Sequence, residues 1–162
     1  MLQHSIPDKH LKSIGDITVS FALLELNIQL FIWSMLNEDQ RIAQIITAEL
    51  SFKNLRALMK SLYLEKYGKE DEDFDKLNKL MIRTGQVEDK RNQIIHSFWG
   101  GSRNTDTISR FKITAKEKDG IKFQFEEVPL DKLSDFATEI KVLAGDIQTY
   151  WISLMDKGKI KK

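Results

Sequence analysis

The scarcity of proline is the feature that most constrains how this chain can fold. Only Pro7 and Pro129 occur among its 162 residues. Proline ends or kinks helices because it lacks a backbone N–H and its ring clashes with the preceding turn. Apolar residues also recur every three to four positions through much of the sequence, which is the spacing of helices that bury one face. Long helical segments are therefore expected on both sides of Pro129.

The first expected helix runs from near Asp8 to near Asn37 and has two apolar stripes. Such a helix lies either at the centre of its domain or against a second subunit. Its most apolar stretch, residues 19–36, also contains polar groups such as Glu25, which would cost about 3 kcal/mol in the middle of a bilayer. We interpret the segment as a buried helix, with a membrane span as the weaker alternative.

Three further helices are expected before residue 102. Asn37 is positioned to cap a short second helix whose buried face would be Ile42, Ile45 and Ile46. Ser51 is a suitable N-cap for the third helix, which would end at Tyr67–Gly68. The fourth would follow the acidic run 70–73 and stop near residues 99–101, with Gly85 as a weak point inside it.

The periodicity changes after residue 106. Apolar residues alternate with polar ones at Phe111 and Ile113 and again at Phe123 and Phe125, with a Lys-Asp-Gly sequence at 118–120 between the two runs. This predicts a β-hairpin at about residues 107–128. A long helix after Pro129 completes the prediction, which is a mainly α, up-and-down helical bundle with one β-hairpin inserted before the C-terminal helix, forming a single domain over residues 1–162.

The overall composition limits the classes of function. The chain has 25 basic and 24 acidic residues, so a nucleic acid would have to be attracted by a local patch and not by net charge. Because cysteine is absent, disulfides, thiolate catalysis and cysteine-bound zinc are excluded. The sequence shows neither a secretory signal pattern nor metal-ligand spacing. We expect a cytoplasmic protein without a membrane span, a metal or a cofactor.

One segment of the fourth expected helix carries residues suited to phosphodiester chemistry. Asn92 and His96 are four positions apart and therefore face the same way on a helix, and the long side chain of Arg91 can reach the same side. An imidazole can take or give a proton near neutral pH. A guanidinium can hold a phosphate, and a carboxamide can orient either group. Arg91, Asn92 and His96 are therefore the candidate catalytic residues.

The pattern Arg91-Asn92-x-x-x-His96 resembles the signature of the HEPN superfamily, an arginine and a histidine four to six residues apart with a polar residue after the arginine. The resemblance implies a helical bundle, a metal-independent ribonuclease in a toxin–antitoxin or phage-defence setting, and a homodimer in which two motifs line one cleft. It also implies RNA as substrate and an antitoxin or other protein as a further partner. Some toxins of the family carry a modifiable tyrosine two residues after the histidine, where this chain has Phe98.

Other residues are candidates for supporting roles. Glu25 is a potential internal partner of Arg91 or His96, although it can equally face solvent, and Glu88 is a potential ion-pair partner of Arg91. Arg103, Arg110 and Lys112 are candidates for binding RNA phosphates, but a polar loop and the exposed face of a hairpin explain them as well. The other two histidines, His4 and His10, are expected to be exposed near the N-terminus, and the three tryptophans are expected in the core or an interface.

Three functions remain open at this stage. The first is an endoribonuclease that cleaves RNA by attack of the 2′-hydroxyl. The second is a catalytically inactive HEPN-like module that binds a protein or a nucleotide, which the near-neutral charge favours. The third is a structural helical dimer in which Arg91 and His96 have no chemical role.

Overall fold

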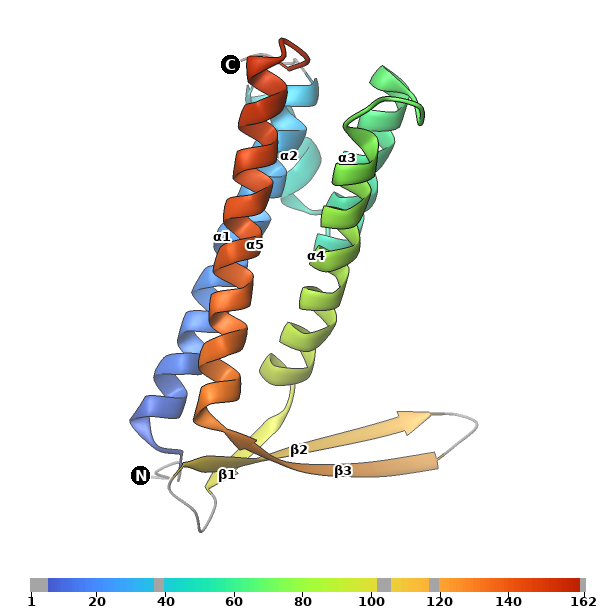
Figure 1. Cartoon of the computed structure of the whole chain (residues 1–162). Coiled ribbons are helices and arrows are strands. Elements are labelled where there is room, and N and C mark those ends of the chain that lie inside the picture. Colours follow the sequence, from blue (N-terminus) through green and yellow to red (C-terminus); the bar gives the residue numbers. More distant parts are fainter. Residues whose placement is uncertain (1–5, 37–39, 102–105, 117–119, 161–162) are drawn as a thin grey trace. The chain divides into compact units, whose positions relative to one another are not determined.

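A computed structural model describes residues 6–36, 40–101, 106–116 and 120–160. In chain order its elements are α1 (Asp8–Leu36), α2 (Gln40–Ala48), α3 (Phe52–Tyr67), α4 (Phe74–Ile95), β1 (Phe98–Gly101), β2 (Thr107–Lys116), β3 (Gly120–Pro129) and α5 (Leu130–Asp156) (Figure 1). The predicted fold class is confirmed, because the chain is mainly helical with its strands inserted before the C-terminal helix. The insertion is larger than predicted, because β1 adds a third strand to the hairpin.

The chain divides into two compact units. Unit 1 comprises residues 1–19 and 90–139, and so contains the start of α1, the end of α4, the three strands and the start of α5. Unit 2 comprises residues 20–89 and 140–162, and so contains α2, α3 and the remaining parts of the three long helices. Each unit is described separately below.

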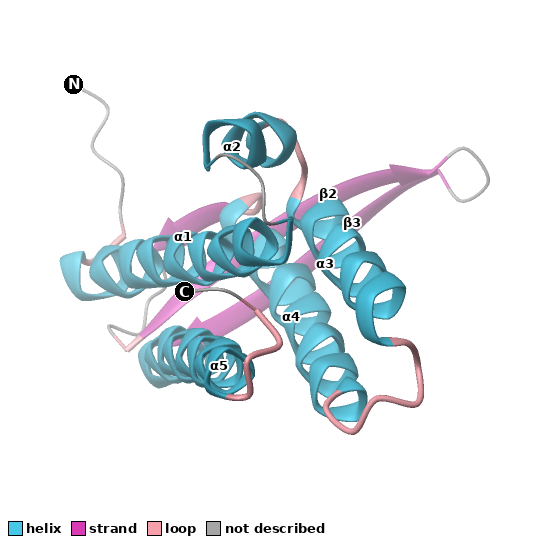
Figure 2. Ribbon diagram, turned by 90° about the horizontal axis from the view of Figure 1, so that it is seen from above, coloured by secondary structure: helices cyan, strands magenta, loops and turns pink. Residues whose placement is uncertain are grey.

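Unit 2 is a helical bundle around an apolar core. In Figures 1 and 2, α1 runs beside α5 and α3 beside α4. Asn27 on α1 donates a hydrogen bond to the carbonyl of Ala144 on α5 over 3.0 Å, and Phe21 packs on Phe52 of α3 with 4.6 Å between ring centroids. The core side chains with no exposed surface include Leu24, Ile28, Phe31, Ile32, Met35, Leu55, Met59, Tyr63, Leu77, Ile140, Ile147 and Tyr150.

The ends of α3 follow the sequence signals closely. Ser51 precedes the helix in an extended conformation, and its side chain accepts a hydrogen bond from the backbone N–H of Asn54. Gly68 follows the helix with φ of 79°, and its N–H bonds to the carbonyl of Leu64. Only glycine adopts such a φ without steric cost, so it ends the helix at Tyr67 as predicted.

Gly85 is not a weak point, because α4 is continuous through it. A Cβ at this position would lie 2.6 Å from Nη1 of Arg56, a residue of α3. The missing side chain lets the guanidinium lie across α4, where it donates to the carbonyl of Met81 over 3.2 Å and to Glu88 over 2.8 Å. Gly85 therefore serves helix packing, and Glu88 forms a largely buried ion pair with Arg56.

The predicted buried face of α2 is wrong. Ile42, Ile45 and Ile46 are 48%, 74% and 42% exposed, whereas Ala43 and Thr47 on the other side are buried. Trp33 of α1 donates to the hydroxyl of Thr47 over 2.8 Å. This bond and the small side chains hold α2 against α1 by its less apolar face. The predicted cap of α2, Asn37, lies outside the described residues.

Within the described part of the chain, α1 is the one helix long and apolar enough to cross a membrane. The same helix supplies much of the core of unit 2, including Leu24, Ile28 and Phe31, which have no exposed surface. This burial agrees with our interpretation of the segment as a core helix.

The sheet of unit 1 has the strand order β1-β2-β3, with both pairs antiparallel. One side of it is covered by helices, since Ile108 and Val128 face each other across β2 and β3 and are 0% and 4% exposed. On the opposite side Ser109 is buried, but six large apolar side chains of the described strands are exposed. We call these six residues the phenylalanine face: Phe98, Phe111, Ile113, Ile121, Phe123 and Phe125.

Two sequence predictions in unit 1 need correction. His10 is not exposed but completely buried, and neither ring nitrogen has a hydrogen-bond partner in the structure as described. The fourth helix ends at Ile95, earlier than residues 99–101, because that segment pairs with β2 as a strand. His4 lies outside the described residues.

Candidate functional site

Hydrogen bonds from His96, Ser97 and Trp99 cap the end of α4 and fix the position of the motif. The backbone N–H of His96 donates to the carbonyl of Asn92 over 3.1 Å, which extends the helical hydrogen bonding by one residue. The indole N–H of Trp99 donates to the carbonyl of Ile94 over 2.9 Å, and the hydroxyl of Ser97 donates to the carbonyl of Gln93. These bonds satisfy carbonyls that a helix end otherwise leaves open, so the last turn is held in place.

Arg91 and Asn92 are in direct contact. Nη1 of Arg91 donates a hydrogen bond to Oδ1 of Asn92 over 2.9 Å, and both side chains are half-buried. The arginine side chain thus reaches its neighbour Asn92, while the expectation that both share one side with His96 stays a prediction. Ile94, between the motif residues, is 9% exposed and anchors this turn in the interior of unit 1.

His96 is exposed and faces the sheet. It lines an open groove of about 700 Å³ together with Phe98, Phe111, Lys112, Ile113, Phe123, Gln124 and Phe125. The structure thus brings Arg91 and Asn92 together through their side chains, and joins His96 to Asn92 through the backbone. The imidazole is accessible to a ligand in the groove, which a proton-transfer role requires.

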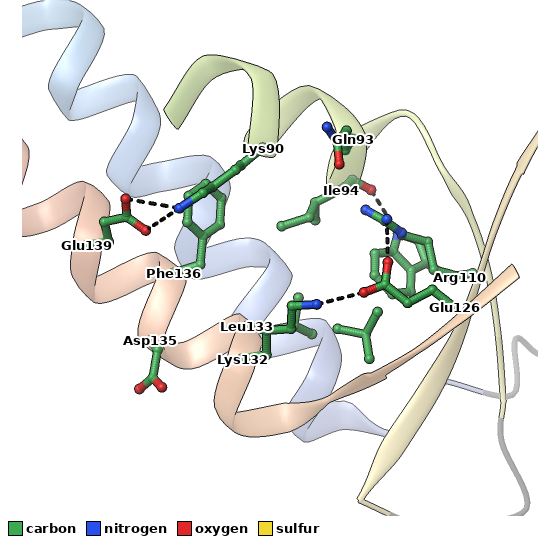
Figure 3. Close-up of a pocket in the computed structure, with 12 residues that line it drawn as sticks. Lys90, Gln93, Ile94, Arg110, Glu126, Lys132, Leu133, Asp135, Phe136 and Glu139 are labelled. Atoms are coloured by element: carbon green, nitrogen blue, oxygen red, sulfur yellow. Dashed lines mark hydrogen bonds and ion pairs between the residues drawn. The ribbon is translucent and has the colours of Figure 1, made fainter. Parts of the chain in front are cut away.

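A second pocket of unit 1, of about 390 Å³, is lined by charged residues that are paired with one another (Figure 3). Glu126 accepts bonds from Arg110 over 2.5 Å and from Lys132 over 2.6 Å, and Lys90 lies 3.0 Å from Glu139. The hydrogen bond from Lys132, with the charge of Arg110 acting in the same direction, lowers the pKa of Glu126. The ion pairs of Glu126 join the sheet to α5. Because the positive charges here are paired with carboxylates, the pocket is a weaker candidate for binding an anion.

The candidate RNA-binding residues have different environments. The side chain of Arg110 is 18% exposed and paired with Glu126. The alternative from sequence, that Arg110 lies on an exposed face of the hairpin, is therefore wrong. Lys112 is half-buried at the groove that His96 lines, and no ion pair of Lys112 is found in the part of the chain described. Arg103 lies outside the described residues. Of the three, Lys112 is the best placed for a phosphate.

The two supporting carboxylates both belong to unit 2. Glu88 is the ion-pair partner of Arg56 described above. Glu25 is half-buried on α1. A role for either in orienting Arg91 or His96 stays a prediction.

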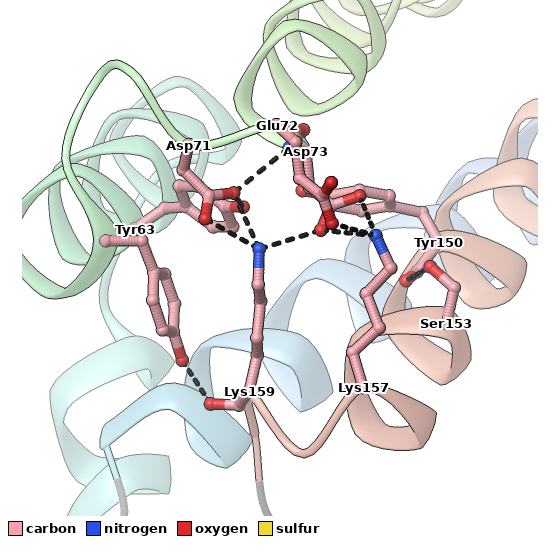
Figure 4. Close-up of polar contacts among 9 residues, drawn as sticks. Tyr63, Asp71, Glu72, Asp73, Tyr150, Ser153, Lys157 and Lys159 are labelled. Carbon is pink, nitrogen blue, oxygen red and sulfur yellow. Dashed lines mark hydrogen bonds and ion pairs between the residues drawn. The ribbon is translucent and has the colours of Figure 1, made fainter.

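A separate polar cluster in unit 2 joins the end of the chain to the segment before α4 (Figure 4). Lys159 contacts Asp71 at 2.6 Å and Asp73 at 2.8 Å, and Lys157 contacts Asp73 at 2.7 Å. The hydrogen bond from Lys159, followed by that from Tyr63, lowers the pKa of Asp71 to about 2. Burial alone lowers the pKa of Lys159, but its bonds to Asp71 and Asp73 raise it overall. Each charged group of this cluster has at least one partner of opposite charge, which is typical of a structural cluster.

Sequence reasoning missed the phenylalanine face as a part of the site. Alternation of apolar and polar residues predicts the strands, but it does not tell which side of a hairpin the rest of the protein covers. The signal available was the number of aromatic residues on the predicted apolar side.

No family model, curated protein or solved structure matches this chain. Among the residues that the structure describes, no three His, Asp or Glu side chains lie close enough together to hold a metal ion. The assignment of a function therefore depends on the motif and on the geometry around it.

Proposed function

We propose that this protein is a metal-independent endoribonuclease of the HEPN type, with Arg91, Asn92 and His96 as its catalytic residues. The observation that carries the proposal is the exposure of His96 on an open groove, one helical turn after the hydrogen-bonded pair of Arg91 and Asn92. A toxin–antitoxin or phage-defence role is the setting that the HEPN resemblance implies.

The proposed reaction is an internal transfer at phosphorus. The ribose 2′-oxygen attacks the adjacent phosphorus, the bond from phosphorus to the 5′-oxygen breaks, and a 2′,3′-cyclic phosphate and a 5′-hydroxyl result. The 2′-hydroxyl proton goes to a base and the departing 5′-oxygen receives a proton, and His96 performs one of these transfers. Arg91 stabilises the negative charge on the phosphoryl oxygens, while Asn92 orients the guanidinium.

The alternative is a catalytically inactive binding module. The exposed phenylalanine face favours this alternative, because large exposed apolar patches usually mark interaction sites. Wild-type protein that binds RNA or a protein but leaves all RNAs intact would support it.

The test compares His96→Ala with Gln93→Ala, a change at an exposed position of the same helical turn that leaves the proposed catalytic groups in place. Cleavage of unstructured RNA by the purified full chain is measured in EDTA, and the product ends are analysed for a cyclic phosphate. We expect the His96→Ala rate to fall at least roughly 100-fold, the lower limit for loss of a general acid or base, with Gln93→Ala near wild type. Equal rates in all three proteins would exclude His96 from catalysis.

Arg91→Lys gives a second, independent measurement. The variant keeps the positive charge but loses the planar fork that can bind a phosphate and Asn92 at once. We expect kcat to fall while the circular dichroism spectrum and the unfolding midpoint stay near those of wild type. Full activity in this variant would show that a point charge suffices and that the pair with Asn92 has no catalytic role.

A further inference from the structure

The groove that His96 lines has aromatic rings along its wall. Strand pairing places Phe98, Phe111 and Phe125 in one row across the sheet, and all three line the groove. Their ring centroids are 6.2 Å apart for Phe98 and Phe111 and 5.1 Å apart for Phe111 and Phe125. Phe123 also lines the groove, two residues from Phe125 on the same side of β3. The rings are therefore accessible from the space that the imidazole faces.

The distribution of phenylalanine in the whole chain points to a role for this wall. The chain has nine phenylalanines, and five of them are buried. The four that are exposed are the four of the groove, and the side chain of Phe123 is 77% exposed. Exposed apolar patches usually mark binding sites, because large apolar side chains are otherwise removed from water. The rings are thus concentrated at the one place where a ligand of His96 would lie.

A cation lies beside the rings. Lys112 lines the same groove, although strand alternation assigns it to the other side of β2. Within the described residues β1 pairs with β2 only as far as Phe111, so this edge of β2 has no neighbouring strand at Lys112. No ion pair of Lys112 is found in that part of the chain. The carboxamide of Gln124 also lines the groove. A positive charge and a hydrogen-bonding amide therefore accompany the rings.

One exposed carboxylate, that of Glu127, lies on the same side of the sheet as the rings. The strand register places Glu127 opposite Ser109, one row inward of Phe111. The groove extends the other way, to Phe123 and His96, and Glu127 is not among the residues that line it. A polyanion would be repelled at the inner row and attracted at the outer one. The charges therefore favour a strand that leaves the rings toward His96.

These features suit unpaired RNA better than a protein surface. Aromatic rings stack on the faces of bases, and a neighbouring cation binds the phosphates, which is how sheets and grooves commonly hold single strands. The core of a protein interface is instead depleted of charged groups. In a duplex the base faces are covered by the adjacent base pairs, so only an unpaired strand can offer them to the phenylalanines.

We propose that the phenylalanine face is a base-stacking platform that holds about two or three consecutive unpaired bases and so selects single-stranded RNA for His96. This inference rests on the proposed function, because it takes the RNA substrate as the ligand of the groove. Every base has a face that can stack, so selection is by strandedness and only weakly by sequence. Phe98 follows His96 by two residues in the same groove, so stacking holds the strand beside the imidazole.

The first experiment measures binding without cleavage. The full chain is titrated with a fluorescent oligonucleotide whose 2′-O-methyl groups prevent cleavage, and with an abasic strand that has the same number of phosphates. Phe123→Leu removes a ring and keeps the site apolar, whereas Phe123→Tyr keeps the ring. We expect Phe123→Leu to raise the Kd for the base-bearing strand about tenfold and Phe123→Tyr to leave it near wild type. Neither variant is expected to change the weaker binding of the abasic strand.

Three results would overturn the platform. They are no binding of the base-bearing strand by wild type, equal Kd values for Phe123→Leu and Phe123→Tyr, and equal binding of the two strands. The matched control is Ile45→Ala on α2, which removes a side chain of similar exposure, 74%, from unit 2 and is expected to bind as wild type. Unfolding midpoints of all variants show whether a weaker Kd reflects a damaged fold.

The same titration separates this proposal from nuclease activity. His96→Ala is expected to bind the uncleavable strand as wild type does, because the rings and Lys112 remain. Ring-dependent binding without cleavage of ordinary RNA would leave the platform and remove the nuclease. Cleavage by wild type with binding that does not depend on the ring would remove the platform and leave the nuclease.

Photo-cross-linking gives an independent readout. A strand carrying 5-iodouracil is irradiated with the full chain, and the linked peptide is identified by mass spectrometry. We expect the link on one of the four groove phenylalanines, with an RNA duplex competing less well than a single strand. Links confined to other segments would contradict the proposal. A change in the mass of the protein assembly in Phe123→Leu, with an unchanged Kd for RNA, would assign the face to a protein partner instead.

Discussion

The lysine–aspartate cluster of unit 2 and the motif of unit 1 are both polar groups at helix ends, but they differ in what their charges contact. In the cluster, Lys159 lies within 3 Å of two carboxylates, and both of these accept further bonds. At the end of α4 the hydrogen bonds fix the backbone, while the imidazole of His96 faces an open groove. Charged groups that have all their partners within the protein stabilise the fold. A side chain that is exposed on a fixed backbone, such as that of His96, remains available for chemistry.

The first prediction tests the structural side of this comparison. Lys159→Met leaves Asp71 and Asp73 without their shared, largely buried cation, and breaking such a pair costs about 3 kcal/mol. We expect the free energy of unfolding in urea to fall by this amount, with RNA cleavage per folded molecule unchanged. The matched control is Lys157→Met, which removes a more exposed lysine of the same cluster and is expected to cost less.

A large loss of cleavage in folded Lys159→Met protein would contradict this separation between a structural cluster and a catalytic site. It would mean that the two regions do not have separate roles, and that the cluster acts on the site as well as on stability.

The second prediction concerns pH. The pKa of Asp71 is about 2 in the folded protein, below its ordinary value of 3.8. Its contribution to stability is therefore fully present above about pH 4 and is lost as the pH falls through 2. Allowing for solvent screening near the surface, this amounts to about 1–2 kcal/mol. Asp71→Asn should flatten this part of the stability curve, measured by urea unfolding between pH 5 and pH 2. An unchanged slope would show that Asp71 is not paired in solution.

The third prediction has the smallest effect and compares two cations of the sheet. Arg110 is paired with Glu126, while Lys112 lies beside the groove without an ion pair in the described chain. We expect Lys112→Gln to raise the Kd for RNA about threefold and to reduce the salt dependence of binding by about one ion, the effect of one lost phosphate contact. Arg110→Gln is expected to change neither quantity by as much. The reverse order would place the RNA at the charged pocket beside Arg110 instead of the groove beside Lys112.

The parts of the fold that were predictable are those governed by local rules. Ser51 and Gly68 set the ends of α3 through hydrogen bonds within a few residues, and the long helices follow from apolar spacing. β1 was missed because its residues continue the apolar run of α4, and because its only ladder pairs Phe98 with Phe111, thirteen positions away. Long-range pairing of this kind leaves no local pattern.

Burial was harder to predict than helix or strand. The isoleucines of α2 are exposed because Trp33 fixes the helix by Thr47, and His10 is buried despite its place near the N-terminus. For the motif, the bond from Arg91 to Asn92 joins adjacent residues, and the expectation that both face the side of His96 stays a prediction. The spacing did not reveal that the groove beside His96 is lined with phenylalanines, because that depends on how the strands continue from α4.

Only His96 and Ser97 separate the end of α4 from the start of β1. His96 thus lies at the junction of helix and sheet. Its backbone N–H is bonded to the helix, and Ser97 leads from it into the edge strand β1. Any tilt of β1 relative to the last helical turn changes the φ and ψ angles of these two residues. The orientation of the proposed proton-transfer group therefore depends on the angle between the sheet and the last turn of α4.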